Sequence, residues 1–178
     1  MLLDPLLHMC RLYESDAGGK VPTTQRIGRK GEQDVVELCR CPNYQRPLMV
    51  LPPNYPLFDV QCTACAFRAQ VKTVRSRPVA RIRGAGWQVM SKVLKSGFLV
   101  PPLVVNWTWR ARKRTYHEIR FYPFIPRQNL HSYALSATAR QPNYEMFDYT
   151  GLRDLPNFVL PQRPPDDRGE RRGGARPR

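Results

Sequence analysis

The chain has 178 residues, of which 42% are hydrophobic, so it can bury the core of about one domain and is not disordered throughout. Lysine and arginine number 29 against 14 aspartates and glutamates, and the resulting net charge of +15 favours nucleic acid as a partner. No stretch approaches the ~20 apolar residues of a membrane span, and the first residues make a poor signal peptide, so we expect a cytoplasmic protein without a membrane partner.

A helix is the first predicted element, after a mixed N-terminal extension over residues 1–24. Thr24 suits the position of the helix cap, and the helix runs through residues 25–38. Its predicted buried side consists of Ile27, Val35 and Leu38. A proline-rich connector follows, and we expect it to be irregular because proline breaks helices and interior strands.

A β-hairpin is predicted next, over the segment FDVQCTACAFRAQVKTV at residues 58–74. One short strand enters a turn with the pattern CxxC, and the return strand runs from about Phe67 to Val74. The arginine-rich residues 75–84 then form a basic loop.

The remaining predicted elements are a short helix and two strands. The helix covers residues 86–97, with Trp87, Met90 and Leu94 on one face. Apolar residues 98–109 form a strand, and a basic turn leads into another strand that ends near residue 126. This order predicts an α/β fold in which helices flank a mixed central sheet, with the domain over residues 25–160 and a disordered basic tail over residues 161–178.

Four cysteines in two close pairs predict a structural zinc site. Cys39 and Cys41 form a CxC pair, and Cys62 and Cys65 form a CxxC pair. Four thiolates satisfy a tetrahedral Zn²⁺, and a bound metal would hold down a connector that is poor in hydrophobic residues. The alternative is that these cysteines are ordinary buried side chains. Cys10 is left as a spare.

Asp59, Gln70 and Lys72 are the candidate catalytic residues. Gln70 and Lys72 are two residues apart on a predicted strand, so both point to the same face. The hairpin brings Asp59 beside them. Asp59 and the Gln70 carbonyl are oxygen donors suited to Mg²⁺, and Lys72 would stabilise charge on a phosphate.

These residues resemble a known nuclease signature. The stretch FDVQCTACAFRAQVKT is similar to the corresponding part of the DpnI-like, or Dam-replacing, restriction endonucleases, which belong to the PD-(D/E)xK nuclease superfamily. In that family the catalytic aspartate lies three residues before a zinc CxxC, and a strand with the pattern (E)xK follows. Asp59 lies three residues before Cys62, and Gln70 and Lys72 fall in register. The resemblance covers residues 30–160.

The resemblance implies a restriction-endonuclease-like fold and a metal-dependent DNA endonuclease of restriction type. Asp59 and Gln70 become ligands of a catalytic Mg²⁺, and Lys72 becomes the catalytic lysine. A structural Zn²⁺ is implied as well. Double-stranded DNA is the implied substrate, with a homodimer or a larger defence system as further partners. A methylation requirement is not implied, because a basic tail stands where the family's best-known member has a methyl-reading winged helix.

The chain departs from the family pattern at two positions. Tyr44 stands where the family has its second upstream zinc cysteine, so Cys39 would have to replace that ligand. Gln70 stands where the family usually has glutamate, and a neutral amide is a poorer Mg²⁺ ligand than a carboxylate. Glu32 or Asp34 on the first helix could supply the missing acid, and a solvated helix face is the alternative.

Arginines and lysines in two segments are candidate phosphate contacts, with a merely solvated basic surface as the alternative. These residues are Arg75, Arg77, Arg81, Arg83, Arg112, Lys113 and Arg114. Trp107 and Trp109 could stack on a base, and packing in a strand core is the alternative.

Two other function classes stay open. One is a catalytically weak or inactive nuclease fold that binds DNA within a larger system. The other is a zinc-ribbon DNA-binding module, in which zinc would matter while Asp59, Gln70 and Lys72 would not cluster.

Overall fold

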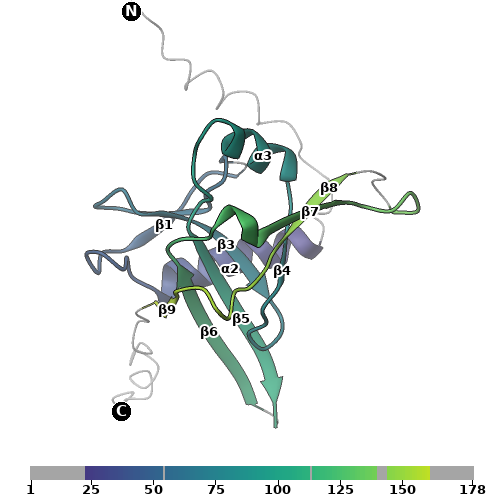
Figure 1. The fold of residues 1–178 in the computed structure, drawn as a ribbon. Coiled ribbons are helices and arrows are strands. Elements are labelled where there is room, and N and C mark those ends of the chain that lie inside the picture. The colour runs from purple at the N-terminus through teal and green to yellow at the C-terminus, as the bar shows by residue number, and fades with distance from the viewer. Residues whose placement is uncertain (1–22, 54, 113, 140–143, 161–178) are drawn as a thin grey trace, which may run out of the picture.

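The computed structural model describes residues 23–53, 55–112, 114–139 and 144–160, which form a mixed α/β fold (Figure 1). The strands of a six-stranded sheet follow the order β1-β2-β3-β5-β6-β9, and those of a three-stranded sheet follow the order β4-β8-β7. The strands are β1 (Leu48–Val50), β2 (Val60–Cys62), β3 (Arg68–Val74), β4 (Ile82–Gly84), β5 (Leu103–Ala111), β6 (Arg114–Tyr122), β7 (Leu130–Ala134), β8 (Glu145–Tyr149) and β9 (Phe158–Val159). The helices are α2 (Thr23–Leu38), α3 (Trp87–Lys95) and the short 3₁₀ helix η2 (Arg127–Asn129).

The larger sheet is mixed because β3 and β5 run parallel. Lys72 of β3 pairs with Val105 of β5, whereas β2 pairs with β3, and β6 with β5, in antiparallel fashion. A parallel pair needs a crossover connection, and here that connection contains β4 and α3. The mixed sheet predicted from the sequence is therefore confirmed.

Helix α2 covers one face of the larger sheet, and α3 and the small sheet cover the other. Alternate residues of a strand point to opposite faces, and accordingly Val104 belongs to one hydrophobic cluster and Val105 to the other. The first cluster contains Val35 of α2, and the second contains Met90 of α3 and Phe147 of β8. The sheet is thus buried on both sides, as expected for a strand order that includes a parallel pair.

Gly31 sets how closely α2 approaches β3. A Cβ atom at Gly31 would lie 1.6 Å from Oγ1 of Thr73, so only glycine fits at this crossing. The side chain of Asn106 adds a hydrogen bond of 3.3 Å from its Nδ2 atom to the carbonyl of Gly31. The close approach places the next residue, Glu32, beside the start of β2.

The predicted helices and the hairpin are present, with small differences in their bounds. The first helix begins at Thr23, one residue before the predicted cap at Thr24. Five strands were not expected from the sequence. Strands β7, β8 and β9 lie after residue 126, where no element was predicted. The short strand β1 lies in the proline-rich connector, and β4 lies in the segment predicted as a basic loop. Each has three residues, which is too short for an alternating pattern to stand out.

Some predictions concern residues outside the described part of the chain. They are the N-terminal extension up to residue 22, the spare Cys10, the phosphate contact at Lys113 and the tail over residues 161–178. Among the helices that the structure does describe, none is both long and apolar enough to cross a membrane.

Candidate functional site

Asp59 lies immediately before β2, where this strand separates from β3. Its backbone N–H donates to the carbonyl of Ala69 (3.0 Å), and its own carbonyl accepts from the N–H of Leu51 (2.8 Å). Its carboxylate Oδ2 accepts a hydrogen bond of 2.6 Å from the N–H of Val71. Backbone and side chain are therefore both fixed, which orients the carboxylate toward the uncovered edge of β3.

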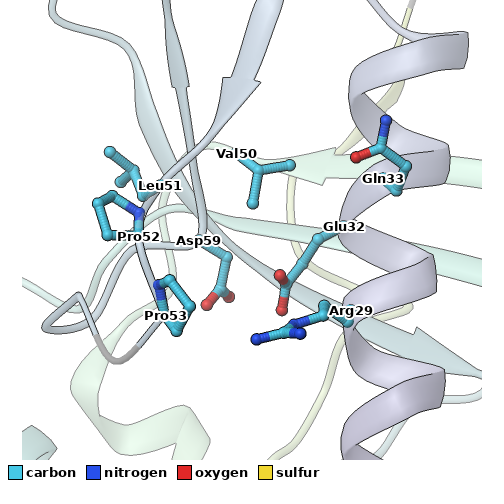
Figure 2. A pocket seen from close by; sticks show the side chains of 8 residues that line it. All are labelled: Arg29, Glu32, Gln33, Val50, Leu51, Pro52, Pro53 and Asp59. Carbon is cyan, nitrogen blue, oxygen red and sulfur yellow. The ribbon is translucent and has the colours of Figure 1, made fainter. Parts of the chain in front are cut away.

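Glu32 faces Asp59 across a cavity of about 300 Å³ (Figure 2). The two carboxylates come from α2 and from the start of β2, and both point into the same space beside Arg29. Burial raises the pKa of Glu32, and the negative charge of Asp59 raises it further. Burial also raises the pKa of Asp59, against the opposing effects of the Val71 N–H and of Lys72. Two carboxylates held together in this way attract a cation.

Lys72 is electrostatically linked to both carboxylates. Burial lowers the pKa of its ammonium group, while Asp59 and Glu32 act in the opposite direction. It follows Val71, whose N–H holds Asp59, by one residue on β3. The structure therefore brings together two acids and one amine from three separate elements.

Gln70 lies next to this group but is engaged elsewhere. Its buried side-chain oxygen accepts a hydrogen bond from the hydroxyl of Tyr149 on β8. Burial raises the pKa of Tyr149, and the nearby Asp59 carboxylate raises it further, so the phenol stays protonated and can donate. Gln70 thus joins the small sheet to the site.

Sequence reasoning found most of this site and missed one member. Asp59, Gln70 and Lys72 are neighbours, as expected. Glu32 and Asp34 were the two candidates for an additional acid. Glu32 lines the cavity with Asp59, whereas Asp34 does not. Tyr149 was not anticipated. It lies 79 residues from Gln70 in the sequence, and a local sequence pattern does not predict a partner so far along the chain.

Cys41, Cys62 and Cys65 form a thiol cluster. Their Sγ atoms all lie within 4.8 Å of one another, and those of Cys41 and Cys65 are 3.5 Å apart. Sulfurs bound at ~2.3 Å to a tetrahedral zinc lie about 3.8 Å from one another. The cluster could therefore hold a metal ion.

Backbone amides support two of these sulfurs. Burial raises the pKa of Cys62, but the N–H of Ala64 and the neighbouring thiols lower it overall. The nitrogen of Ala64 lies 3.3 Å from the Sγ of Cys62. Burial raises the pKa of Cys41, against the amides of Tyr44 and Asn43. Amides therefore lie near both sulfurs. They favour the thiolate at Cys62, whereas burial outweighs them at Cys41 and keeps its pKa raised.

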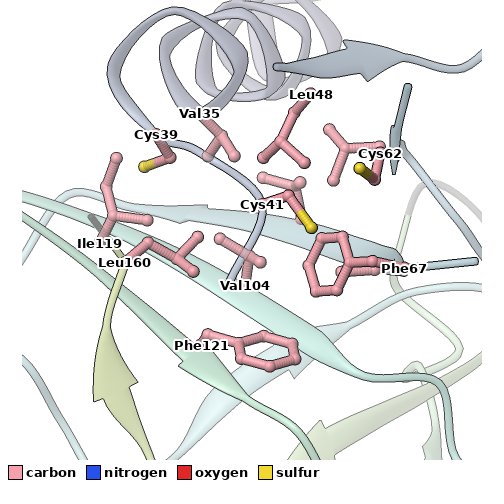
Figure 3. Packing of buried hydrophobic residues seen from close by; sticks show 13 residues of the cluster. Val35, Cys39, Cys41, Leu48, Cys62, Phe67, Val104, Ile119, Phe121 and Leu160 are labelled. Atoms are coloured by element: carbon pink, nitrogen blue, oxygen red, sulfur yellow. The ribbon is translucent and has the colours of Figure 1, made fainter. Parts of the chain in front are cut away.

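Cys39 is not part of the cluster, so its prediction as the fourth ligand is wrong for this structure. Figure 3 shows its sulfur beside Ile119 and Leu160, away from those of Cys41 and Cys62. The N–H of Cys39 donates to Val35 (2.9 Å), so the last helical turn directs its side chain into the core. Burial raises its pKa to about 12, which disfavours the thiolate that zinc requires.

The predicted phosphate contacts are exposed in two segments that meet. The described members are Arg75, Arg77, Arg81, Arg83, Arg112 and Arg114, all of them exposed. Arg81 lies 3.8 Å from Asp148. Arg75 and Arg77 lie between β3 and β4, Arg83 lies in β4, and Arg112 and Arg114 belong to the β5–β6 hairpin. Arg77 and Arg112, one from each segment, line a common hollow.

Comparison with protein-family models and with curated proteins finds no match for this chain.

Proposed function

We propose that this chain is a metal-dependent DNA endonuclease of restriction type, with a restriction-endonuclease-like fold similar to that of the DpnI-like family. The observation that carries the proposal is the Asp59 carboxylate, which is fixed on the Val71 N–H beside Lys72 and faces Glu32 across a cavity. A metal held by Asp59 would activate water, and the ammonium group of Lys72 would stabilise the charge that develops on a phosphodiester during hydrolysis.

The topology supports this proposed fold. The acid lies at the start of one strand, the lysine lies on the adjacent antiparallel strand, and a helix packs over the latter. The edge of β3 beyond Ala69 is not paired with β2, because Val60 of β2 pairs with Ala69. The open edge gives a phosphate access to the site.

The carboxylates of Asp59 and Glu32 fit Mg²⁺. This ion takes few protein oxygens and keeps waters and substrate phosphates as its other ligands. A bound Mg²⁺ would neutralise charge on the phosphate and acidify a water molecule. Asp59 and Glu32 would hold the ion, and Lys72 would stabilise the negative charge that develops on the phosphate.

Gln70 has a supporting role in this proposal. Its bond from Tyr149 fixes β8 against β3 beneath Asp59. The carboxylate that the family places at this position is then supplied by Glu32, from the opposite side of the cavity.

We assign a structural Zn²⁺ to Cys41, Cys62 and Cys65. The CxxC turn connects β2 to β3, so a metal there would fix the hairpin that aligns Asp59 with Lys72. The three thiols leave one position of a tetrahedral ion for a ligand outside this group.

Double-stranded DNA is the proposed substrate in a cytoplasmic setting, and the exposed arginines would hold its phosphates. Such contacts make binding strongly dependent on salt and do not read sequence. A homodimer or a partner from a larger defence system would then supply the choice of target.

The second candidate function is DNA binding without efficient cleavage. The observation that favours it is the neutral Gln70, whose oxygen is already engaged by Tyr149. A site that depends on Glu32 alone for its second carboxylate would bind a cation less tightly than one with an additional acid at position 70.

Incubation with supercoiled plasmid tests the proposed function. Adenine-methylated and unmethylated plasmids are incubated with the full chain and Mg²⁺ or Mn²⁺, beside the variant Asp59→Ala and the control Asp154→Ala, which replaces an exposed acid. We expect nicked or linear product from wild type and the control only. Absence of metal-dependent cleavage of both plasmids, with DNA binding intact, would leave the binding function in place of the nuclease.

A further inference from the structure

A second hollow lies on the β5–β6 hairpin, away from Asp59. It has a volume of about 520 Å³. Its lining consists of Arg77, Pro78, Trp109, Ala111, Arg112, Tyr116, Glu118 and Arg120. We call it the Trp109 pocket. One wall is therefore the segment that follows β3, and the other is the hairpin.

Two parallel aromatic rings line the Trp109 pocket. Trp109 and Tyr116 are cross-strand partners, with ring centroids 5.4 Å apart and an angle of 8° between the planes. Tyr116 is 40% exposed and Trp109 is half-buried, whereas Trp107, two residues earlier, is fully buried. Core packing therefore accounts for Trp107, while the Trp109–Tyr116 pair is partly accessible to solvent.

The charge around these rings is positive. Three arginines line the pocket against one acid, and that acid, Glu118, is bonded to Arg120. Arg77 and Arg112 are exposed and come from opposite walls. Among the described residues neither guanidinium group has an ion-pair partner. Aromatic rings flanked by such groups suit a ligand that combines a planar group with an anion.

The pocket lies on the same sheet face as Lys72. Lys72 pairs with Val105, and Val105, Trp107 and Trp109 alternate along β5, so their side chains point to one side. Trp109 is four positions after Val105, which is about 13 Å along the strand at ~3.3 Å per residue. A nucleic acid strand that passes Lys72 could reach the pocket within a few nucleotides.

We propose that the Trp109 pocket binds one unpaired nucleotide of a DNA strand. The base stacks on the Trp109–Tyr116 pair, and Arg77 and Arg112 hold its phosphate. Stacking on aromatic side chains tolerates any base, so this site positions a strand without reading its sequence. The inference concerns binding alone and holds whether or not Asp59 supports cleavage.

Fluorescence anisotropy tests the proposal with labelled oligonucleotides in the Asp59→Ala background and without divalent cation. We expect Tyr116→Leu to weaken binding of a short single strand by about 5- to 100-fold, and to weaken binding of the matched duplex much less. The control is Phe124→Leu, which removes a ring of similar exposure, 49%, outside the pocket. Equal effects of Tyr116→Leu and the control on the single strand would overturn the proposal.

Tryptophan emission provides a readout that needs no destabilising variant. We expect the single strand to quench the emission of the unlabelled chain, and Trp109→Phe to remove most of that quenching. Arg77→Gln should weaken binding of the single strand more than Arg153→Gln does, because Arg153 is an exposed arginine outside the pocket. Unchanged emission at saturating oligonucleotide would contradict stacking. If free deoxyadenosine monophosphate also quenches the emission, the pocket binds a free nucleotide as well as a nucleotide within a strand.

Discussion

The carboxylate of Asp59 accepts a hydrogen bond of 2.6 Å from the backbone N–H of Val71, one residue before Lys72 on the neighbouring strand. The bond fixes the acid relative to the strand that carries the lysine. Since the bond uses one carboxylate oxygen, Oδ2, the other can serve a cation in the cavity shared with Glu32.

Removing the acid on α2 should impair the cation site. We expect Glu32→Gln to lower apparent Mg²⁺ affinity by roughly 10- to 100-fold, the range seen when a group that supports a metal site is lost. Adding Gln70→Glu to this variant should recover much of the affinity, because a carboxylate returns from the other side. Isothermal titration with Mg²⁺ or Mn²⁺ measures both effects.

Glu37→Gln is the matched control for that experiment. Glu37 is exposed on the same helix and accepts a hydrogen bond of 2.8 Å from Gln33. If Glu32→Gln and Glu37→Gln bind the cation equally well, Glu32 is not a ligand, although Asp59 could still be one.

Asp59 should make stability depend on pH. Because burial raises its pKa, protonated Asp59 favours the folded chain at low pH, and this contribution is lost as the pH rises through the folded-state pKa. Asp59→Asn keeps an acceptor for the Val71 N–H and does not ionise. Without divalent cation, the variant should therefore melt above wild type at neutral pH, and the difference should shrink on acidification.

Thermal unfolding of both proteins across this pH range measures that effect. Adding Mg²⁺ at neutral pH should raise the melting temperature of wild type more than that of Asp59→Asn. Asp154→Asn, which replaces an exposed acid, should follow wild type throughout. A constant difference between Asp59→Asn and wild type at every pH would contradict a buried, ionising Asp59.

Zinc content should separate the clustered thiols from Cys39. We expect about one zinc per purified chain, and loss of it in Cys41→Ser, Cys62→Ser and Cys65→Ser. Cys39→Ala should keep the metal and lose only the packing of a small buried side chain, about 1 kcal/mol of the unfolding free energy. Elemental analysis and denaturant unfolding provide the readouts, and loss of zinc from Cys39→Ala would restore this residue as a ligand.

Gly31 should be essential to the crossing of α2 and β3. Gly31→Ala puts a Cβ atom 1.6 Å from Thr73 Oγ1, so the helix must shift, and overpacking of this kind costs about 1–3 kcal/mol. Gly28→Ala meets nothing within 4 Å and should stabilise the helix by about 0.5–1 kcal/mol. In urea unfolding we expect Gly31→Ala to lower the free energy of unfolding and Gly28→Ala to raise it. Equal changes in the two variants would contradict a tight crossing of α2 and β3.

The sequence predicted the longest elements, which are α2, α3, β3, β5 and β6. The helix with Val35 on its buried side and the hairpin around the CxxC turn are both present. Strands β1, β4 and β9 were missed because two or three residues carry no period, and the prolines and arginines around β1 and β4 indicate loops. Strands β7 and β8, of five residues each, were also missed.

The site was only partly predictable for a different reason. Hairpin register places Asp59 beside Gln70 and Lys72, and register follows from local sequence. Whether Glu32 faces the site depends on the helix crossing at Gly31, and the partnership of Gln70 with Tyr149 depends on the small sheet. Contacts between segments that are far apart in the chain produce no characteristic residue spacing in the sequence, so they could not be predicted from it. At Cys39 the sequence spacing was misleading. Its spacing from Cys41 is typical of a pair of metal ligands, but the end of α2 directs the Cys39 side chain into the core.

The most direct test of the proposed cation site is a crystal grown with Mn²⁺, measured for anomalous scattering. We predict a peak in the cavity between the carboxylates of Asp59 and Glu32, which disappears in Asp59→Ala crystals while the signal of the metal at Cys41, Cys62 and Cys65 remains. A peak elsewhere, or none at saturating Mn²⁺, would contradict the assignment of Asp59 and Glu32 as the metal site of a nuclease.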